Sequence, residues 1–243
     1  MHTDVKSSFR GRSINFYPIG STNIVLRNKN EHFTMNRPVT TANNLIFGTL
    51  YLDLAGDVTC VNRNTNEKCV IKFFKRGWGN KNAYKLEGTI INAEGEVVYD
   101  VYGHWHREIF IKHRETEMEV PIWKLNERLD QWDHLYHFSL FTLQLNYIDE
   151  ELMEKLPCTD SRLRPDQRAL ENGDLELASK EKHNVEEYQR NQRKDREKQG
   201  IEWEPRYFVK KKDDFNDHDY YEFTGKYWED RESGKVKELE RVF

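Results

Sequence analysis

The sequence predicts a mainly β protein, with an antiparallel sheet that curls toward a barrel and one long helix toward the C-terminus. Short stretches of alternating apolar and polar residues, separated by turn residues, recur along the first 150 residues, which is the pattern of consecutive antiparallel strands. A long polar stretch follows Asn172-Gly173-Asp174, which is typical of a turn and a helix N-cap, and it ends at Gly200, a typical helix stop.

The strands follow one another with short turns between them. Alternation predicts strands at residues 13–18, 23–27, 33–35, 44–54, 57–62, 68–75, 84–92, 97–111 and 135–148. Gly48 interrupts the most apolar of these stretches and indicates a bulge. We expect residues 112–134 to be a flexible crossing with one short helical piece. The aromatic-rich tail, residues 203–228, is expected to be extended and to pack over the end of the long helix, and the last dozen residues to be loose.

Composition limits the classes of function. The 243 residues suit one domain, and a net charge of −4 gives no support to nucleic-acid binding over the whole surface. The three cysteines include no CxxC pair, which fits a reducing cytosol. Cys60 and Cys69 can face each other across a hairpin, and two free thiols are expected. No apolar run approaches 18 residues and no signal peptide opens the chain, so we expect a cytoplasmic protein whose membrane contact is peripheral.

The stretch from Thr159 to Lys198 concentrates the charged residues of interest. Arg162, Arg164 and Arg168 crowd around Pro165, which prevents a helix from running through their middle. Within the long helix, Lys182, Glu186 and Arg190 fall at i, i+4 and i+8 and share one face. Two cations separated by one carboxylate can hold a phosphate group, or they can form an ordinary ion ladder on a solvated helix.

Other constellations are weaker candidates for chemistry. His104 and His106 lie on one face of a strand, but no Cys or carboxylate cluster is spaced to complete a metal site with them. Four residues that are close in sequence have side chains suited to acid–base catalysis: Asp130, Asp133, His134 and His137. No nucleophile in a recognisable sequence context accompanies them, so they do not predict an active site. We therefore expect no enzyme activity, no metal and no cofactor.

Two features bear on membranes. Trp78, flanked by glycines, either inserts into a membrane surface or closes a loop over the edge of the core. The cluster from Arg190 to Lys198 either meets anionic lipid or is a solvated helix end, since Asp195 and Glu197 interrupt it.

A resemblance adds to this interpretation. The ordered string Thr159-Asp160-Ser161-Arg162-Leu163-Arg164-Pro165-Asp166, Glu171-Asn172-Gly173, Ala178, Glu181-Lys182 and Glu186-Glu187 resembles the C-terminal signature of the oxysterol-binding protein family. Earlier segments match in the same order, from Phe9-Arg10-Gly11 through Asn44 to Gly48, Lys85 to Gly88 and Tyr102 to Trp105. The resemblance covers about residues 6–230. It implies a large antiparallel barrel around a lipid tunnel, and it implies that Lys182, Glu186 and Arg190 belong to a phosphoinositide headgroup site.

The departures from the family pattern are also informative. The family's tandem histidines, which are followed by two prolines, are absent: all nine histidines stand singly and no Pro-Pro occurs. The chain therefore resembles the C-terminal portion of one lipid-binding domain, an incomplete barrel without the lid. In this interpretation the barrel strands occupy about residues 6–150, the Arg-rich segment and long helix 159–200, and a packing tail 201–243.

The expected function is lipid binding and non-vesicular transfer between membranes. By resemblance, the expected ligand is a sterol or phospholipid, with phosphatidylinositol 4-phosphate as its exchange ligand, and we expect peripheral contact at organelle membranes and no nucleic-acid partner. The alternative is a truncated homologue that does not bind lipid and acts as an interaction or regulatory module. Strand edges left unpaired by an incomplete barrel also predict a tendency to associate.

Overall fold

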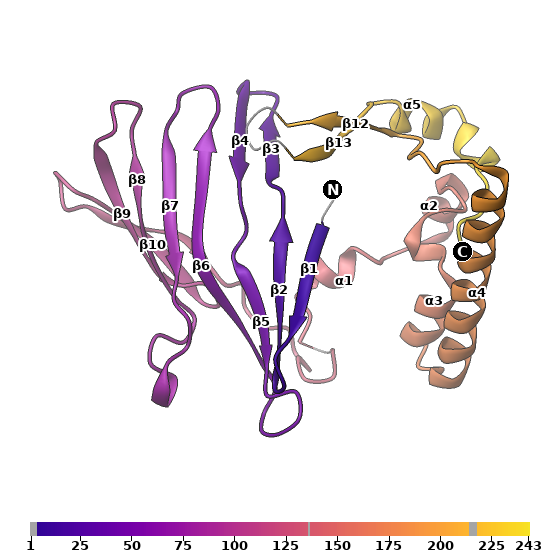
Figure 1. The fold of residues 1–243 in the computed structure, drawn as a ribbon, viewed down its shortest axis with the longest axis horizontal. Coiled ribbons are helices and arrows are strands. Elements are labelled where there is room, and N and C mark those ends of the chain that lie inside the picture. Colours follow the sequence, from indigo (N-terminus) through magenta and orange to yellow (C-terminus); the bar gives the residue numbers. More distant parts are fainter. Residues whose placement is uncertain (1–3, 136, 214–217) are drawn as a thin grey trace. The chain divides into compact units, whose positions relative to one another are not determined.

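The computed structural model describes residues 4–135, 137–213 and 218–243 (Figure 1). Two compact units make up the chain. The sheet unit comprises the residues up to Glu127 together with Lys211–Tyr220, and the helical unit comprises Arg128–Lys210 and Tyr221–Phe243. That the two units together make one lipid-binding domain stays a prediction.

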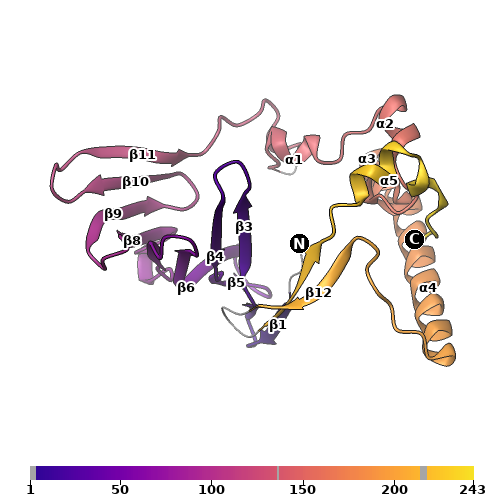
Figure 2. The same ribbon diagram turned by 90° about the horizontal axis from the view of Figure 1, so that it is seen from above.

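The sheet unit is built on an 11-stranded antiparallel sheet. Its strands are β1 (Asp4–Phe9), β2 (Ser13–Ile19), β3 (Thr22–Leu26), β4 (Glu31–Met35), β5 (Val39–Asn43), β6 (Tyr51–Asn62), β7 (Lys68–Phe73), β8 (Lys85–Ile91), β9 (Val97–His104), β10 (Glu108–His113) and β11 (Glu119–Lys124). The order is β1-β2-β5-β6-β7-β8-β9-β10-β11, and the β3–β4 hairpin joins it through β4 and β6. The sheet curls without closing (Figure 2), as the sequence predicted.

The core of the sheet unit lies on the central strands. Val58, Leu86 and Val101 are buried on β6, β8 and β9, and register places Leu86 opposite Gly103 and Val101 opposite Gly88. A Cβ at Gly88 would lie 2.2 Å from the carbonyl oxygen of Val70. Only glycine fits there, because neighbouring backbone occupies the place of a side chain.

A buried polar network holds Asp213 to the sheet. Asp213 is only 4% exposed; its carboxylate lies 2.5 Å from the Arg63 guanidinium and accepts a hydrogen bond from Ser21 at 3.2 Å. Arg63 Nε also donates to Thr34 Oγ1 at 2.5 Å, and Thr34, 1% exposed, donates to Asn23 at 2.7 Å. The network fixes β3, β4 and the end of β6 against Asp213, which directly follows β12 (Phe208–Lys212); β12 pairs with β13 (Asp219–Phe223).

The helical unit contains α1 (Leu140–Gln144), α2 (Glu150–Lys155), α3 (Pro165–Glu171), α4 (Leu175–Gln199) and α5 (Tyr227–Glu232), with 3₁₀ helices η2 (Ser161–Leu163) and η3 (Lys235–Glu238). The termini of α4 are the predicted ones. Asp174 accepts a hydrogen bond from the Leu177 amide as N-cap, and Gly200 takes the left-handed conformation, with φ of 67°, at the C-terminal end.

Several local predictions are wrong. In the predicted strand 135–148, the described residues 135 and 137–148 form no strand: Ser139 caps the amide of Thr142 and starts α1, so local capping outweighs the alternating pattern. The apolar stretch 44–54 is a strand only from Tyr51, because Asn44 and Gly48 have positive φ and form a loop. Residues 112–134 contain the strand β11, and the last strand of the large sheet ends at Lys124 rather than near residue 150.

The end of the chain is packed rather than loose. Val236 is fully buried and Phe243 is nearly so. Two side chains of α4, Tyr188 and Gln189, donate hydrogen bonds to the carbonyls of Arg241 and Val242 at 3.1 and 3.0 Å. The apolar residues spaced between the charges of this tail therefore belong to the core of the helical unit.

Among the described residues, no helix combines the length and the apolar character needed to cross a membrane.

Candidate functional site

The three residues of the predicted headgroup site lie along α4. Lys182, Glu186 and Arg190 are all exposed, at successive turns of the helix. Val185, 1% exposed, is buried between them on the adjoining face, so packing fixes the rotation of the helix. The structure therefore brings the three side chains to one solvent-facing edge, as spacing predicted.

The ion pairs differ from the expected ladder. Arg190 pairs with Glu187, three residues earlier, instead of with Glu186. The carboxylate of Asp166, followed more weakly by that of Glu186, raises the pKa of the Arg164 guanidinium, so Glu186 lies near α3. In the part of the chain that the structure describes, Lys182 forms no ion pair. Its ammonium is the cation of this face that remains available to an anionic ligand.

The arginine-rich segment that precedes α4 neutralises its own carboxylates. Arg162 binds Asp160 through two bonds of 2.8 and 2.9 Å, and Arg164 binds Asp166 through two of 2.7 and 2.9 Å. These guanidinium groups hold the pKa of each aspartate below its usual value. Because bidentate pairs occupy both arginines, we assign them to the structure of the unit and not to ligand binding.

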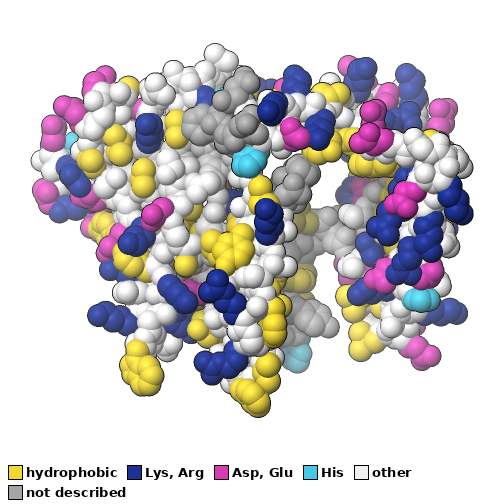
Figure 3. All heavy atoms as spheres, viewed as in Figure 1, with side chains coloured by type: hydrophobic (Ala, Val, Ile, Leu, Met, Phe, Trp, Pro, Cys, Tyr) yellow, Lys and Arg dark blue, Asp and Glu magenta, His cyan; other side chains and the backbone are white. Residues whose placement is uncertain are grey.

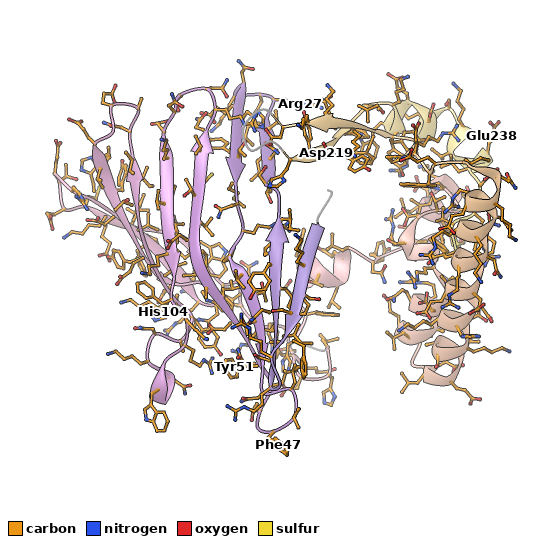
Figure 4. All side chains as sticks on the ribbon, viewed as in Figure 1. Arg27, Phe47, Tyr51, His104, Asp219 and Glu238 are labelled. Carbon is orange, nitrogen blue, oxygen red and sulfur yellow. The ribbon has the colours of Figure 1, made fainter. Side chains whose placement is uncertain are left out.

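A second candidate surface lies at one end of the sheet. The loops at residues 44–50 and 74–84 follow β5 and β7. Antiparallel pairing places the start of β6, Tyr51, opposite Asn43 of β5, and the end of β7, Phe73, opposite Gly56 of β6. Phe47 is 75% exposed and points away from the strands (Figure 4), and Trp78 is 99% exposed. The interpretation that Trp78 closes a loop over the core is therefore wrong.

The same end of the sheet is basic. The β1–β2 turn adjoins the first loop, since the Leu45 amide donates to the Arg12 carbonyl at 3.0 Å. Figure 3 shows hydrophobic side chains at the loop tips with Lys and Arg beside them. Segments 9–13, 44–50 and 74–84 contain no Asp or Glu, and their cations are Arg10, Arg12, Lys75, Arg76 and Lys81. This surface, called the loop-tip surface below, combines apolar tips with positive charge.

One cation of the loop-tip surface is rigidly held. The Arg76 guanidinium stacks on Tyr51 at 4.2 Å and on Tyr84 at 4.7 Å, and its backbone amide donates to buried Asp53 at 2.8 Å. These contacts join the start of β6 to the second loop, so the two tips form one surface. Sequence patterns missed the surface because the run from Leu45 to Leu50 resembles a strand. Asn44 and Gly48 were the available signals of a loop.

The histidine candidates are held by aromatic neighbours. The ring of His106 lies 4.1 Å from that of Tyr84 and 6.1 Å from that of His104. Burial, with the nearby charges, lowers the pKa of His106. Among the described residues, no three His, Cys, Asp or Glu side chains are grouped closely enough to hold a metal ion. Two of the four residues considered for an acid–base site, His137 and Asp133, are both exposed. The imidazole Nδ1 of His137 lies 3.6 Å from Oδ1 of Asp133.

Comparison with known proteins decides the family. The family model described as oxysterol-binding protein matches residues 1–232. The chain belongs to the oxysterol-binding protein family. It is 32% identical to oxysterol-binding protein homolog 2 of Saccharomyces cerevisiae over 98% of its length, and it spans 20% of that protein.

Solved structures of the oxysterol-binding protein family share the fold. The Osh1 ORD domain in complex with ergosterol is 32% identical and superimposes with a TM-score of 0.86, over 99% of this chain and 61% of that domain. The Osh3 ORD in complex with PI(4)P from Saccharomyces cerevisiae is 27% identical, with a TM-score of 0.81 over 99% of this chain and 62% of that one. The chain therefore spans about a fifth of the yeast relative's length and about three fifths of the solved domains.

Proposed function

We propose that this chain binds lipid and transfers it between membranes without vesicles. The observation that carries the proposal is the match of 99% of the chain to two domains, one solved with ergosterol and one with PI(4)P. The ligand class that follows is a sterol or glycerophospholipid, with phosphatidylinositol 4-phosphate as an exchange ligand. The site of action that follows is the cytosolic surface of organelle membranes, reached by peripheral contact.

The binding energy in this proposal is divided between two kinds of surface. Apolar residues of the curled sheet, such as Ile71 and Ile90, provide burial worth about 25 cal/mol per Å² of lipid surface removed from water. On α4, Lys182 provides a charge-assisted contact to phosphate oxygens, and Arg190 provides a second once it leaves Glu187. A sterol uses only the first kind of surface, and a phosphoinositide uses both.

The loop-tip surface supplies the membrane contact. Aromatic side chains prefer the membrane–water interface, and each Lys or Arg near an anionic bilayer contributes about 1 kcal/mol. The surface offers Phe47 and Trp78 at its tips and no acidic residue in the three segments that form it. Although the chain as a whole is acidic, this surface is therefore locally attractive to anionic lipid.

We predict that Phe47→Ser combined with Trp78→Ser weakens binding to vesicles of phosphatidylcholine and phosphatidylserine. Each ring loses on the order of 1 kcal/mol of interfacial burial, so the partition coefficient falls roughly ten- to thirtyfold. Vesicle sedimentation measures it. Met118→Ser is the matched control, because Met118 is 61% exposed in the β10–β11 turn, at the opposite end of the strands. Equal losses in the control and the double variant would refute the assignment of this surface.

A second candidate function is an interaction or regulatory module that does not bind lipid. It is favoured by the open sheet: among the described residues, β1 and β11 stand at the two ends of the strand order and present strand edges with which a partner can pair. Incubation of the 243-residue chain with liposomes containing sterol and phosphatidylinositol 4-phosphate separates the two candidates. Re-isolated protein that carries about one lipid per chain supports the carrier, whereas lipid-free protein supports the module.

A further inference from the structure

Three sulfur-containing side chains lie in a row across neighbouring strands of the sheet unit. Met35 on β4 is directly opposite Cys60 on β6, and Cys60 is directly opposite Cys69 on β7. Residues that are directly opposite in antiparallel strands carry their side chains on the same face. The two thiols and the thioether therefore project side by side from one face, and all three residues are half-buried.

The pattern of backbone hydrogen bonds sets the distance between the Cα atoms of Cys60 and Cys69. The Asn62 amide donates to the Glu67 carbonyl at 2.9 Å, which marks a hydrogen-bonded pair. Two residues along, Cys60 and Cys69 form a pair of the same type, whose Cα atoms stand about 5.5 Å apart. In an unstrained disulfide the two Cβ atoms lie about 3.5–4.5 Å apart. Opposite Cβ atoms in antiparallel strands lie about 4.5–5.5 Å apart, and hydrogen-bonded pairs are at the wider end of that range. Opposite cysteines in such a pair favour free thiols over a disulfide, and Cys60 and Cys69 are both free in the structure.

The thioether stands closer to its neighbour. The Arg63 amide donates to the His32 carbonyl at 2.7 Å, so alternation makes Met35 and Cys60 a non-hydrogen-bonded pair with Cα atoms about 4.5 Å apart. A metal ion with metal–sulfur bonds of about 2.3 Å, the length found for zinc thiolates, spans the two thiolates. The side chain of Met35 is long and flexible enough to reach the same ion.

The thiols are held in their protonated form when no ion is present. Burial raises the pKa of Cys60, and burial together with the neighbouring Cys60 raises the pKa of Cys69 to about 11. Val58 and Ile71, two residues away on the same strands, give the row an apolar setting. Such thiols are poor nucleophiles at neutral pH, so ordinary thiolate reactivity does not account for the arrangement.

We propose that Met35, Cys60 and Cys69 form a binding site for copper(I). Thiolate and thioether sulfur are the ligands that select this soft monovalent ion. In the described part of the chain no third His, Cys, Asp or Glu completes a site for a harder metal. One Cu⁺ replaces the two thiol protons and forms two copper–thiolate bonds. The step releases two H⁺ and involves no oxidation or reduction.

The test is a competition titration of the fully reduced 243-residue protein, without oxygen, against a chromophoric copper(I) chelator. We expect one ion per chain. Because two protons leave, affinity rises about a hundredfold per pH unit between about pH 6 and 8. Retention of no copper against the chelator, or an affinity independent of pH, would overturn the site.

Substitutions identify the ligands. Met35→Leu conserves volume and keeps the fold, and we expect affinity to fall by at least about tenfold, the low end for loss of a supporting group at metal sites. The double variant Cys60→Ser/Cys69→Ser should lose the ion, with thermal melting to confirm folding. Cys158→Ser is the matched control, because Cys158 is exposed and belongs to the helical unit. Unchanged affinity in Met35→Leu, or a loss in Cys158→Ser equal to that of the double variant, would contradict the proposal.

Discussion

Replacement of Asp213 by alanine should destabilise the protein by about 3–5 kcal/mol, the range for removal of one partner of a buried ion pair. The reason is that Arg63 and Thr34 remain in place after the carboxylate is lost. The guanidinium, 2.5 Å from Asp213 Oδ1, then stays in a largely desolvated position without that counter-charge. Urea denaturation followed by tryptophan fluorescence measures the change in the free energy of unfolding.

A comparable pair on the surface provides the control. Arg114 and Asp100, which also belong to the sheet unit, form an ion pair in which a guanidinium nitrogen lies 2.7 Å from a carboxylate oxygen. Both side chains are more than two fifths exposed. Arg114→Ala should therefore change the urea midpoint little, because solvent screens exposed pairs. If the midpoints of Asp213→Ala and Arg114→Ala coincide, the buried network does not stabilise the fold as we describe.

Replacement of Lys182 by alanine should weaken phosphoinositide binding by roughly ten- to a hundredfold while sterol binding stays unchanged. One charge-assisted hydrogen bond to a phosphate oxygen is worth about 1.5–3 kcal/mol, and a sterol has no phosphate. Glu186→Gln should have a smaller effect, because a carboxylate offers no donor to phosphate oxygens and Glu186 lies near Arg164 instead of pairing with Arg190. Extraction of each lipid from liposomes gives the two affinities separately.

Lys180 offers a matched control for Lys182. It is also exposed on α4, but two residues along a helix rotate the side chain by about 200°, which places it on another face. Lys180→Ala removes the same charge from the same helix and should leave binding unaffected. Equal weakening by Lys180→Ala and Lys182→Ala would indicate only a general effect of charge, and the headgroup assignment would be withdrawn.

Much of the fold was predictable because hydrophobic alternation and turn residues act locally. The hairpin of β6 and β7 around residues 63–67 and both termini of α4 follow from residues that lie within a few positions of each other. The strand predicted over residues 97–111 is instead the hairpin of β9 and β10, since Trp105, His106 and Arg107 form its turn. Alternation continues through that turn, and the sequence pattern contained no break.

The parts that were not predictable depend on contacts between distant residues. The ion pair of Arg63 and Asp213 joins positions 150 apart in sequence, and burial of Val236 and Phe243 depends on packing with the helical unit. Spacing alone placed Lys182, Glu186 and Arg190 on one face, but not the choice of Glu187 as the partner of Arg190. Neighbouring carboxylates compete for one guanidinium, and the geometry of the folded helix decides between them.

Whether α4 holds a phosphoinositide headgroup can be measured by NMR with a soluble short-chain phosphatidylinositol 4-phosphate. Backbone amide signals of the 243-residue chain are followed during titration, with short-chain phosphatidylinositol as the ligand that lacks the 4-phosphate. We expect shifts concentrated around residues 182–190 that appear only with the 4-phosphate and are lost in Lys182→Ala. Shifts confined to the sheet unit, or identical shifts with both ligands, would contradict it.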